Sequence, residues 1–203
     1  GLVFDWLDRD DHDDIRIATV RRLQRLFTVD VRHADRVAKT AAELLAQVAP
    51  AWGLDCHPES IDAPRYAVWL DIAARLHEIG LAVSHSGFHH HGAYILSYAD
   101  MPGLTRPAQM IIASLVHTHR RKFKLQRFDE VDERLREQIV RLSAVLRLAV
   151  LLHRDRSPRP NLSRVRLEAG ADNLHVSFPD GWLKTRPLTR VDLELEQSYL
   201  AMA

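Results

Sequence analysis

The sequence predicts a mainly α protein, in which a helical domain over residues 1–155 is followed by a small α+β C-terminal domain over residues 156–203. Apolar residues recur at three- and four-residue spacing across most of residues 31–152, which indicates helices with one buried face. Two short alternating runs, residues 165–167 and 174–178, flank the turn sequence of residues 170–173 and are typical of a β-hairpin. Residues 157–161 read Ser-Pro-Arg-Pro-Asn, which is typical of a linker between the two parts.

Capping residues set the limits of the expected helices. Asp14 and Asp30 precede the first two helices, and an aspartate at this position accepts hydrogen bonds from backbone amides of the first turn. Pro50 is expected to end the second helix, and Gly80 to end the third in a left-handed conformation. The expected helices cover residues 15 onward, 31–49, 63–79, 89–99, 105–119, 132–153 and 191–201, the last with a strand at its start as an alternative.

Composition narrows the class of protein. The chain of 203 residues carries 28 Lys and Arg against 27 Asp and Glu, so its net charge does not favour polyanions as a whole, and we expect no nucleic-acid partner. Cys56 is the only cysteine, which excludes an internal disulfide and suits a reducing, cytoplasmic location. No apolar run approaches the ~20 residues of a membrane helix. Because residue 1 is glycine and not methionine, we expect a longer parent protein.

Histidines are concentrated in the middle of the sequence. Seven of the twelve lie between residues 77 and 119, and His85, His89, His90 and His91 crowd the start of an expected helix. Imidazoles and backbone amides at the positive end of a helix are suited to bind phosphate. The alternative is a surface loop with one or two structural histidines.

Two clusters of basic residues accompany the histidines. Residues 120–127 hold five cations and no acid, and a second group consists of Arg154, Arg156, Arg159, Arg164 and Arg166. If both groups lie beside the loop of residues 85–91, they form a local groove for a polyanion. Either group alone is more typical of a solvated surface.

His33, His77 and Glu78 form a further pattern. It is similar to that of metal-dependent phosphohydrolases of the HD superfamily, in which an early histidine and a later His-Asp pair hold a divalent ion. Those proteins also need an aspartate on a later helix, where this chain has Val150, which cannot bind a metal. One interpretation is a vestigial metal site of these three residues. The other, which we favour, is a scaffold whose histidines only form structural hydrogen bonds.

Several longer motifs resemble one family, the exopolyphosphatase/guanosine pentaphosphate phosphohydrolase (Ppx/GppA) family. The resemblance rests on the central segments Leu76–Leu81, His85–Leu96, Asp100–Gly103, Leu115–Lys122 and Leu146–Leu152. Gly1–Leu7 resembles the start of that family's C-terminal half, and Phe178–Trp182 with Asp192–Glu196 resembles its end. The chain therefore resembles the C-terminal portion, an HD-like helical domain plus a small C-terminal domain.

The resemblance implies an accessory role. In this family, hydrolysis of phosphoric anhydrides takes place in an N-terminal actin-like region with magnesium, so we expect no catalytic residue and no cofactor in this chain. The resemblance implies binding of polyphosphate or guanosine pentaphosphate, contact with the N-terminal domains, and a homodimer. The expected polyphosphate-binding residues are His85, His89, His91, His117, His119, Arg120, Arg121 and Lys122.

Two alternatives to that role stay open. One is a self-standing HD-type metal-dependent phosphohydrolase acting on nucleotides. The other is a dimerisation domain without a ligand, in which the basic clusters are only solvated surface.

Overall fold

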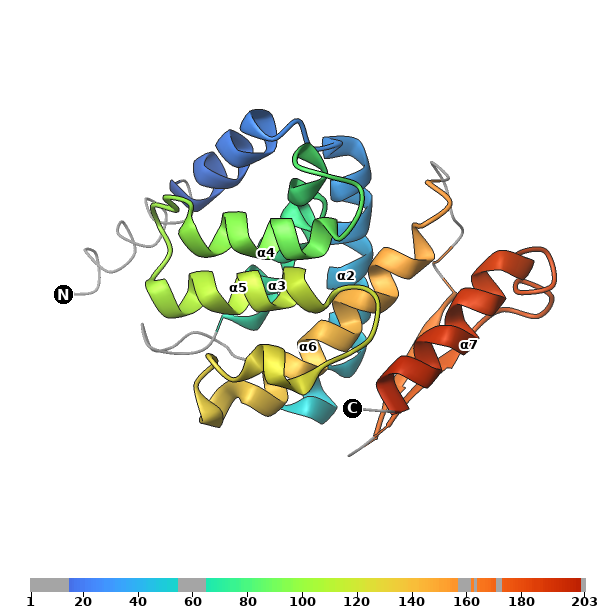
Figure 1. Cartoon of the computed structure of the whole chain (residues 1–203). Helices are drawn as coiled ribbons and strands as arrows, with labels where there is room; N and C mark the ends of the chain where they lie inside the picture. The colour runs from blue at the N-terminus through green and yellow to red at the C-terminus, as the bar shows by residue number, and fades with distance from the viewer. Residues whose placement is uncertain (1–14, 55–64, 157–161, 163, 171–172, 202–203) are drawn as a thin grey trace, which may run out of the picture.

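A computed structural model describes residues 15–54, 65–156, 162, 164–170 and 173–201. The chain is mainly α with a small α+β C-terminal part, as predicted (Figure 1). Among the described residues, no helix is long and apolar enough to cross a membrane. The elements are a helix over residues 15–26, α2 (Val31–Trp52), α3 (Tyr66–Leu76), the 3-10 helix η1 (Ile79–Ala82), α4 (Phe88–Tyr98), α5 (Arg106–Thr118), the 3-10 helix η2 (Leu125–Phe128), α6 (Glu133–Leu152), β1 (Arg166–Ala169), β2 (Leu174–Ser177) and α7 (Pro187–Ala201).

Helix α2 shows why a proline alone is a poor end signal. Asp30 caps its start as predicted, because its carboxylate accepts a hydrogen bond from the backbone amide of His33 at 3.0 Å. The predicted end at Pro50 is wrong, since the helix continues to Trp52. Gly53 ends it with φ 64°, and its amide donates to the carbonyl of Ala49. Proline in the last turn removes one donor, whereas the left-handed glycine redirects the chain.

Gly80 has a different role from the one predicted. Helix α3 ends at Leu76, and Gly80 lies inside η1 without a positive φ angle, so it is not a left-handed cap. A Cβ atom at this position would lie 2.0 Å from the carbonyl oxygen of Phe88 and 2.5 Å from the amide nitrogen of Gly92. The glycine is therefore needed because the backbones of η1 and α4 touch here.

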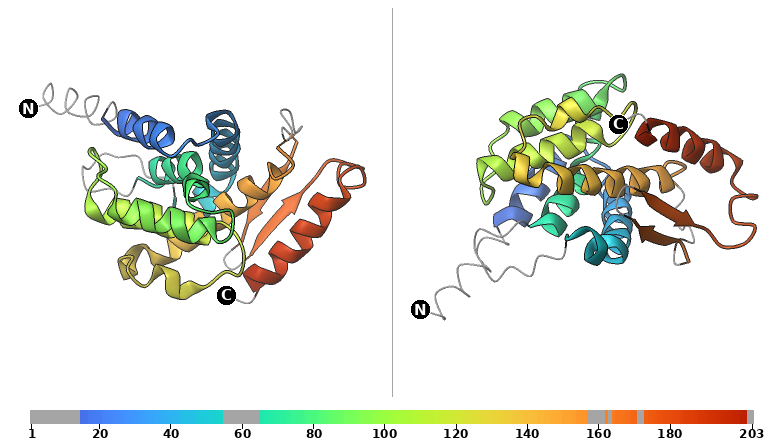
Figure 2. Two further views of the ribbon diagram at one scale, coloured as in Figure 1. Left: turned by 45° about the horizontal axis from the view of Figure 1, so that its top comes forward. Right: turned by 90° about the horizontal axis from the view of Figure 1, so that it is seen from below.

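Helix α3 packs against α2, α5 and α6. Helix α2 contacts α3 and α6, and α4 lies against α5 and η1. The predicted buried faces form one continuous apolar cluster, which includes Val37, Leu44, Leu70, Leu142 and Leu146. Figures 1 and 2 show α4 and α5 side by side at one end of this bundle. This packing brings the ends of α3, α4 and α5 together, where most of the histidines lie.

The C-terminal part packs against the helices through β1. Strands β1 and β2 are antiparallel, with Leu167 opposite Val176, as the hairpin signal predicts. Leu167 donates its backbone amide to the side-chain oxygen of Gln47 at 3.0 Å, and the indole of Trp52 donates to the carbonyl of Gly170 at 2.9 Å. Helix α7 begins at Pro187, before its predicted start, and lies beside α6 (Figure 2).

The domain boundary at residues 155 and 156 stays a prediction. Val165, Leu167 and Trp182 belong to the same buried cluster as the helical part. Several features of the sequence lie outside the described residues. They are the cap Asp14, Pro64, Cys56, Arg159, the linker of residues 157–161 and the motif Gly1–Leu7.

Candidate functional site

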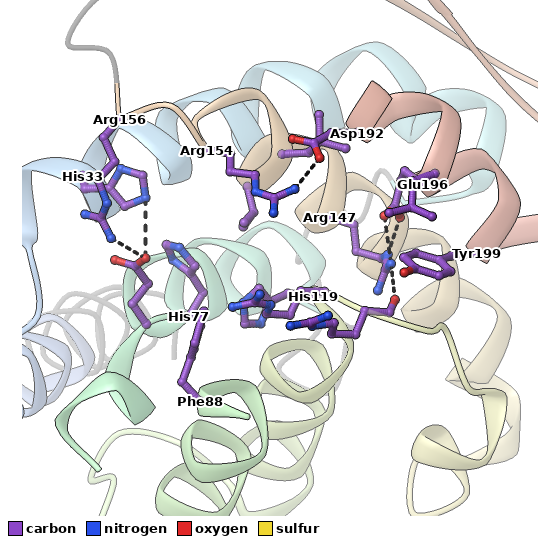
Figure 3. A pocket seen from close by; sticks show the side chains of 16 residues that line it. His33, His77, Phe88, His119, Arg147, Arg154, Arg156, Asp192, Glu196 and Tyr199 are labelled. Atoms are coloured by element: carbon purple, nitrogen blue, oxygen red, sulfur yellow. Dashed lines mark hydrogen bonds and ion pairs between the residues drawn. The ribbon is translucent and has the colours of Figure 1, made fainter. Parts of the chain in front are cut away.

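A pocket of about 270 Å³ lies where α2, α3, α5, α6 and α7 meet, and we name it the histidine pocket (Figure 3). Histidines form its inner wall, and basic residues of the α5 end and of α6 line its mouth. Helix α7 covers one side with acidic residues. The lining residues are His33, His77, Glu78, Phe88, His119, Arg120, Arg121, Arg147, Val150, Leu151, Arg154, Arg156, Asp192, Leu195, Glu196 and Tyr199.

Three of these side chains have the arrangement of a metal site. One ligand atom each of His33, His77 and Glu78 lies within 4.8 Å of the others. His77 is almost completely buried, and its Nδ1 donates to the carbonyl of Ala74 at 2.7 Å. Its Nε2 has no hydrogen-bond partner among the described residues, and so presents a lone pair. Burial lowers the pKa of His77 to about 4, which keeps the imidazole neutral at pH 7.

Two other residues oppose a working metal centre there. The guanidinium of Arg156 lies 2.7 Å from Glu78 Oε1 and 3.2 Å from Asp30 Oδ2, so it already neutralises the carboxylate. Val150 lines the same pocket and offers methyl groups where a fourth ligand would be needed. Two imidazoles and one carboxylate suit a zinc-like ion better than magnesium.

His119 faces the histidine pocket and not the loop before α4. Its Nδ1 donates to the carbonyl of Val116, its Nε2 has no partner among the described residues, and its ring packs 5.4 Å from that of His77 between centroids. Burial lowers the pKa of His119 well below the usual value. His117 lies two residues away and points to the other side, because successive helical residues turn by about 100°.

Helix α7 is tied to the pocket by ion pairs. Arg147 of α6 is completely buried, and its guanidinium donates to both carboxylate oxygens of Glu196 and to the carbonyls of Thr118 and Arg121. Arg154 pairs with Asp192 one turn earlier on α7. These acids neutralise two of the basic residues around the histidine pocket.

A second hollow, of about 140 Å³, lies on the other side of Arg120 and Arg121, and we name it the basic pocket. None of the described residues that line it is acidic. Nδ1 of His90 and Nε2 of His117 are 2.7 Å apart, and the rings of His89 and His90 are 4.0 Å apart between centroids. Its lining residues are His89, His90, His117, Thr118, Arg120, Arg121, Lys122, Lys124 and Arg127.

Burial and neighbouring charges lower the pKa values of the three histidines in the basic pocket. Burial, followed by neighbouring cations, lowers the pKa of His89 and of His117 to about 4 and also lowers that of His90. The cations around His89 are Arg120 and Arg121, and Arg127 acts on His117. An anion in the pocket would offset this repulsion and favour protonation of the imidazoles.

Comparison with known proteins decides the family. Residues 15–197 match the family model described as Ppx/GppA phosphatase, domain III. The chain belongs to the Ppx/GppA phosphatase family. It is 34% identical over 197 residues to a guanosine-5'-triphosphate,3'-diphosphate pyrophosphatase of Aeromonas hydrophila, and 35% identical over 198 residues to one of Vibrio cholerae. These alignments cover 97% of this chain but only 38% and 37% of those proteins, so the chain spans less than two fifths of their length.

This Ppx/GppA chain brings together five of the eight residues predicted to bind polyphosphate. His89, His117, Arg120, Arg121 and Lys122 line the basic pocket, whereas His119 lines the histidine pocket. His85 and His91 line neither of these two pockets. Among the described members of the second basic group, Arg154 and Arg156 are the ones that line the histidine pocket, and both pair with carboxylates.

Besides Thr118, three imidazole or basic residues that line the basic pocket were absent from the candidate list. These are His90, Lys124 and Arg127. All three belong to the two segments already singled out, residues 85–91 and 120–127, so the signal was present in the sequence. Which side chains of those segments face inward depends on how α4 packs against α5.

Proposed function

We propose that this chain is the accessory region of a Ppx/GppA enzyme that binds the phosphate chain of polyphosphate or guanosine pentaphosphate. Hydrolysis itself would take place in a magnesium-dependent N-terminal actin-like region. The observation that carries the proposal is the basic pocket, in which eight imidazole, guanidinium and ammonium side chains converge without an acid among the described lining residues. The relatives are named as pyrophosphatases of guanosine-5'-triphosphate,3'-diphosphate, which supports an anionic substrate of this class.

The physical chemistry of polyphosphate fits such a pocket. Each phosphate carries about one negative charge, and contacts with Arg and Lys release counterions, so binding should weaken as salt rises. Several contacts of moderate strength allow the polymer to advance without all of them breaking together. Arg120 and Arg121 line both the basic pocket and the mouth of the histidine pocket, and so extend the basic surface toward α6.

The proposal includes a homodimer. Leu188, Val191 and Leu195 on α7 are exposed by 80%, 59% and 46%, and their spacing places them along one side of the helix. Exposed apolar residues in a row on one helix suit contact with a second copy. The HD-like character of the helical part likewise remains a proposal based on resemblance.

Charge reversal at Arg120 and Arg121 tests the binding role. We expect the Arg120→Glu/Arg121→Glu variant to lose polyphosphate affinity by about 100-fold or more at low salt, because two charged contacts become repulsive. Its salt dependence should also become shallower. Titration calorimetry at three salt concentrations measures both effects.

A charge-matched control variant distinguishes loss of the proposed contacts from a general effect of net charge. Arg164 and Lys184 are exposed and line neither pocket, so Arg164→Glu/Lys184→Glu changes the net charge equally and should bind almost normally. Circular dichroism on all three proteins checks that they are folded, and light scattering measures whether two chains associate. Equal affinity of the Arg120→Glu/Arg121→Glu variant and the parent chain would refute the proposed role.

One observation favours a second candidate function, a metal-dependent phosphohydrolase of nucleotides. It is the convergence of His33, His77 and Glu78 with a buried lone pair on His77 Nε2. An ion held there would activate water for attack on phosphorus. We rank this function second because Val150 supplies no metal ligand and because Arg156 forms an ion pair with the carboxylate of Glu78.

Phosphate release by the metal-stripped chain separates the two functions. We expect none from long-chain polyphosphate or guanosine pentaphosphate, with or without added magnesium, manganese or zinc. The matched proteins are His77→Gln, which removes the lone pair, and His85→Gln, which lies outside both pockets. Metal-dependent release that persists in His85→Gln and disappears in His77→Gln would establish the second function instead.

A further inference from the structure

A third hollow adjoins the basic pocket, and neither the predicted sites nor the proposed function uses it. It has a volume of about 470 Å³ and lies along the line where α4 meets α5. This volume falls within the ~300–1,000 Å³ typical of small-ligand sites. Ala93, Met110 and Ala113 contribute apolar surface to it, and Tyr94 and Tyr98 line it from α4. We name it the tyrosine groove.

The two tyrosines are unusually open for large aromatic side chains. Tyr94 and Tyr98 are exposed by 69% and 73%, and their ring centroids are 4.9 Å apart. They are one helical turn apart on the same side of α4, so both rings border the groove. Exposed aromatic faces beside a cationic surface are the usual means by which proteins stack nucleobases.

The tyrosine groove and the basic pocket are neighbours. His90, His117 and Arg127 line both hollows, so a ligand in one lies against residues that also line the other. His90 and Tyr98 are eight residues apart on α4, which corresponds to about 12 Å along the helix. That span suits a nucleotide with its base on the tyrosines and its phosphates among the histidines.

Polar groups at the groove give it a preference among bases. Glu130 and Gln126 line it opposite α4, and Arg106 lines it near Tyr98. A carboxylate accepts hydrogen bonds only, and guanine presents two adjacent donors, N1–H and the exocyclic amine. Adenine presents no such pair, so a carboxylate here favours guanine.

We propose that the tyrosine groove binds the guanine base of a guanosine polyphosphate whose phosphates lie in the basic pocket. The inference rests on the proposed function, because it assigns the phosphates to that pocket. It adds a separate site for the base, and so predicts that this region distinguishes a nucleotide from inorganic polyphosphate. The base stacks on Tyr94 and Tyr98, and Glu130 accepts from its donor edge.

Calorimetric titration of the full chain with matched ligands tests the proposal. The probes are guanosine 5'-triphosphate 3'-diphosphate, its adenosine analogue and inorganic pentaphosphate. We expect Tyr94→Ala/Tyr98→Ala to weaken guanosine nucleotide binding about 5- to 150-fold, as for the loss of base stacking, and to leave inorganic pentaphosphate binding unchanged. Tyr94→Phe/Tyr98→Phe keeps the rings and should bind nearly as the parent does.

The outcomes separate this inference from the proposed function. If the chain binds neither the nucleotides nor inorganic pentaphosphate, the proposed phosphate-binding role of the basic pocket is refuted. If it binds both with equal affinity, and the alanine variant has the affinities of the parent, only the assignment of the tyrosine groove as a base site is refuted. Glu130→Gln should reduce the preference for the guanosine over the adenosine nucleotide, and an unchanged preference would overturn the assignment of Glu130. A change from dimer to monomer in the alanine variant, without an effect on nucleotide affinity, would mark the tyrosines as an interface between two copies instead.

Discussion

The Gly80→Ala variant is expected to lose about 3 kcal/mol or more of unfolding free energy. The added methyl group would meet the carbonyl of Phe88 at 2.0 Å and the amide of Gly92 at 2.5 Å. Both are backbone atoms of α4, so no side-chain rotation relieves the clash, and η1 must move away from α4. Chemical denaturation of the variant and the parent measures the loss.

Gly53→Ala is the matched control for this loss. Gly53 has a φ of 64°, but nothing lies within 4 Å of the position of its Cβ, so alanine there should cost only ~1–2 kcal/mol of backbone strain. The two substitutions add the same methyl group and differ in what it meets. A Gly80→Ala variant as stable as Gly53→Ala would contradict the close approach of η1 and α4.

The Gly80→Ala substitution should also affect polyphosphate binding. Displacement of η1 moves α4 at its first turn, which carries His89 and His90, relative to α3, which precedes His77. We therefore expect weaker polyphosphate binding in any fraction of the variant that still folds. Stability and binding should change together, because one backbone contact holds both pockets in place.

Removal of the buried arginine at position 147 should have a comparable effect. We expect Arg147→Ala to cost about 3–5 kcal/mol, the range for breaking a buried ion pair by deleting one partner. The guanidinium has no exposed surface in its side chain and joins Glu196 to the carbonyls of Thr118 and Arg121. Its loss leaves those acceptors without this donor and removes one of the two ion pairs, Arg147–Glu196 and Arg154–Asp192, that tie α7 to the pocket.

An exposed ion pair within α7 provides the comparison. Arg190 donates to Glu194 at 3.0 Å, and both side chains are more than half exposed, so Arg190→Ala should change stability by less than about 1 kcal/mol. Urea unfolding followed by circular dichroism compares the two variants. Equal stability of both variants would mean that α7 is not held by Arg147.

Local signals predicted the elements of the fold well. The apolar spacing within α2 and α6 depends only on each helix having one buried face, and Asp30 caps α2 through a backbone amide three residues away. The hairpin required only a turn between two alternating runs. Each of these signals involves residues close in sequence, so no knowledge of the packing was needed. Pro50 failed as an end signal because the left-handed Gly53, three residues later, ends the helix. Gly80 failed because its role depends on α4, which approaches it in space.

The candidate site was predicted only in part, for a geometric reason. The segments of residues 85–91 and 120–127 were recognisable from composition alone as rich in histidine and in basic residues, respectively. Which of their side chains share a pocket depends on the rotation of α4 and α5 about their axes, and this separates His117 from His119.

The sequence by itself determined the helical architecture and the basic character of the central region, since these follow from spacing and residue type, and its longer motifs resembled the family that the comparisons then showed. Only the tertiary structure decided which charges are neutralised. Arg154 and Arg156 belonged to a basic cluster in sequence, as Arg120 did, yet each pairs with a carboxylate at least 38 positions away. Electrostatic energy depends on distance in space, and the folded chain alone sets that distance.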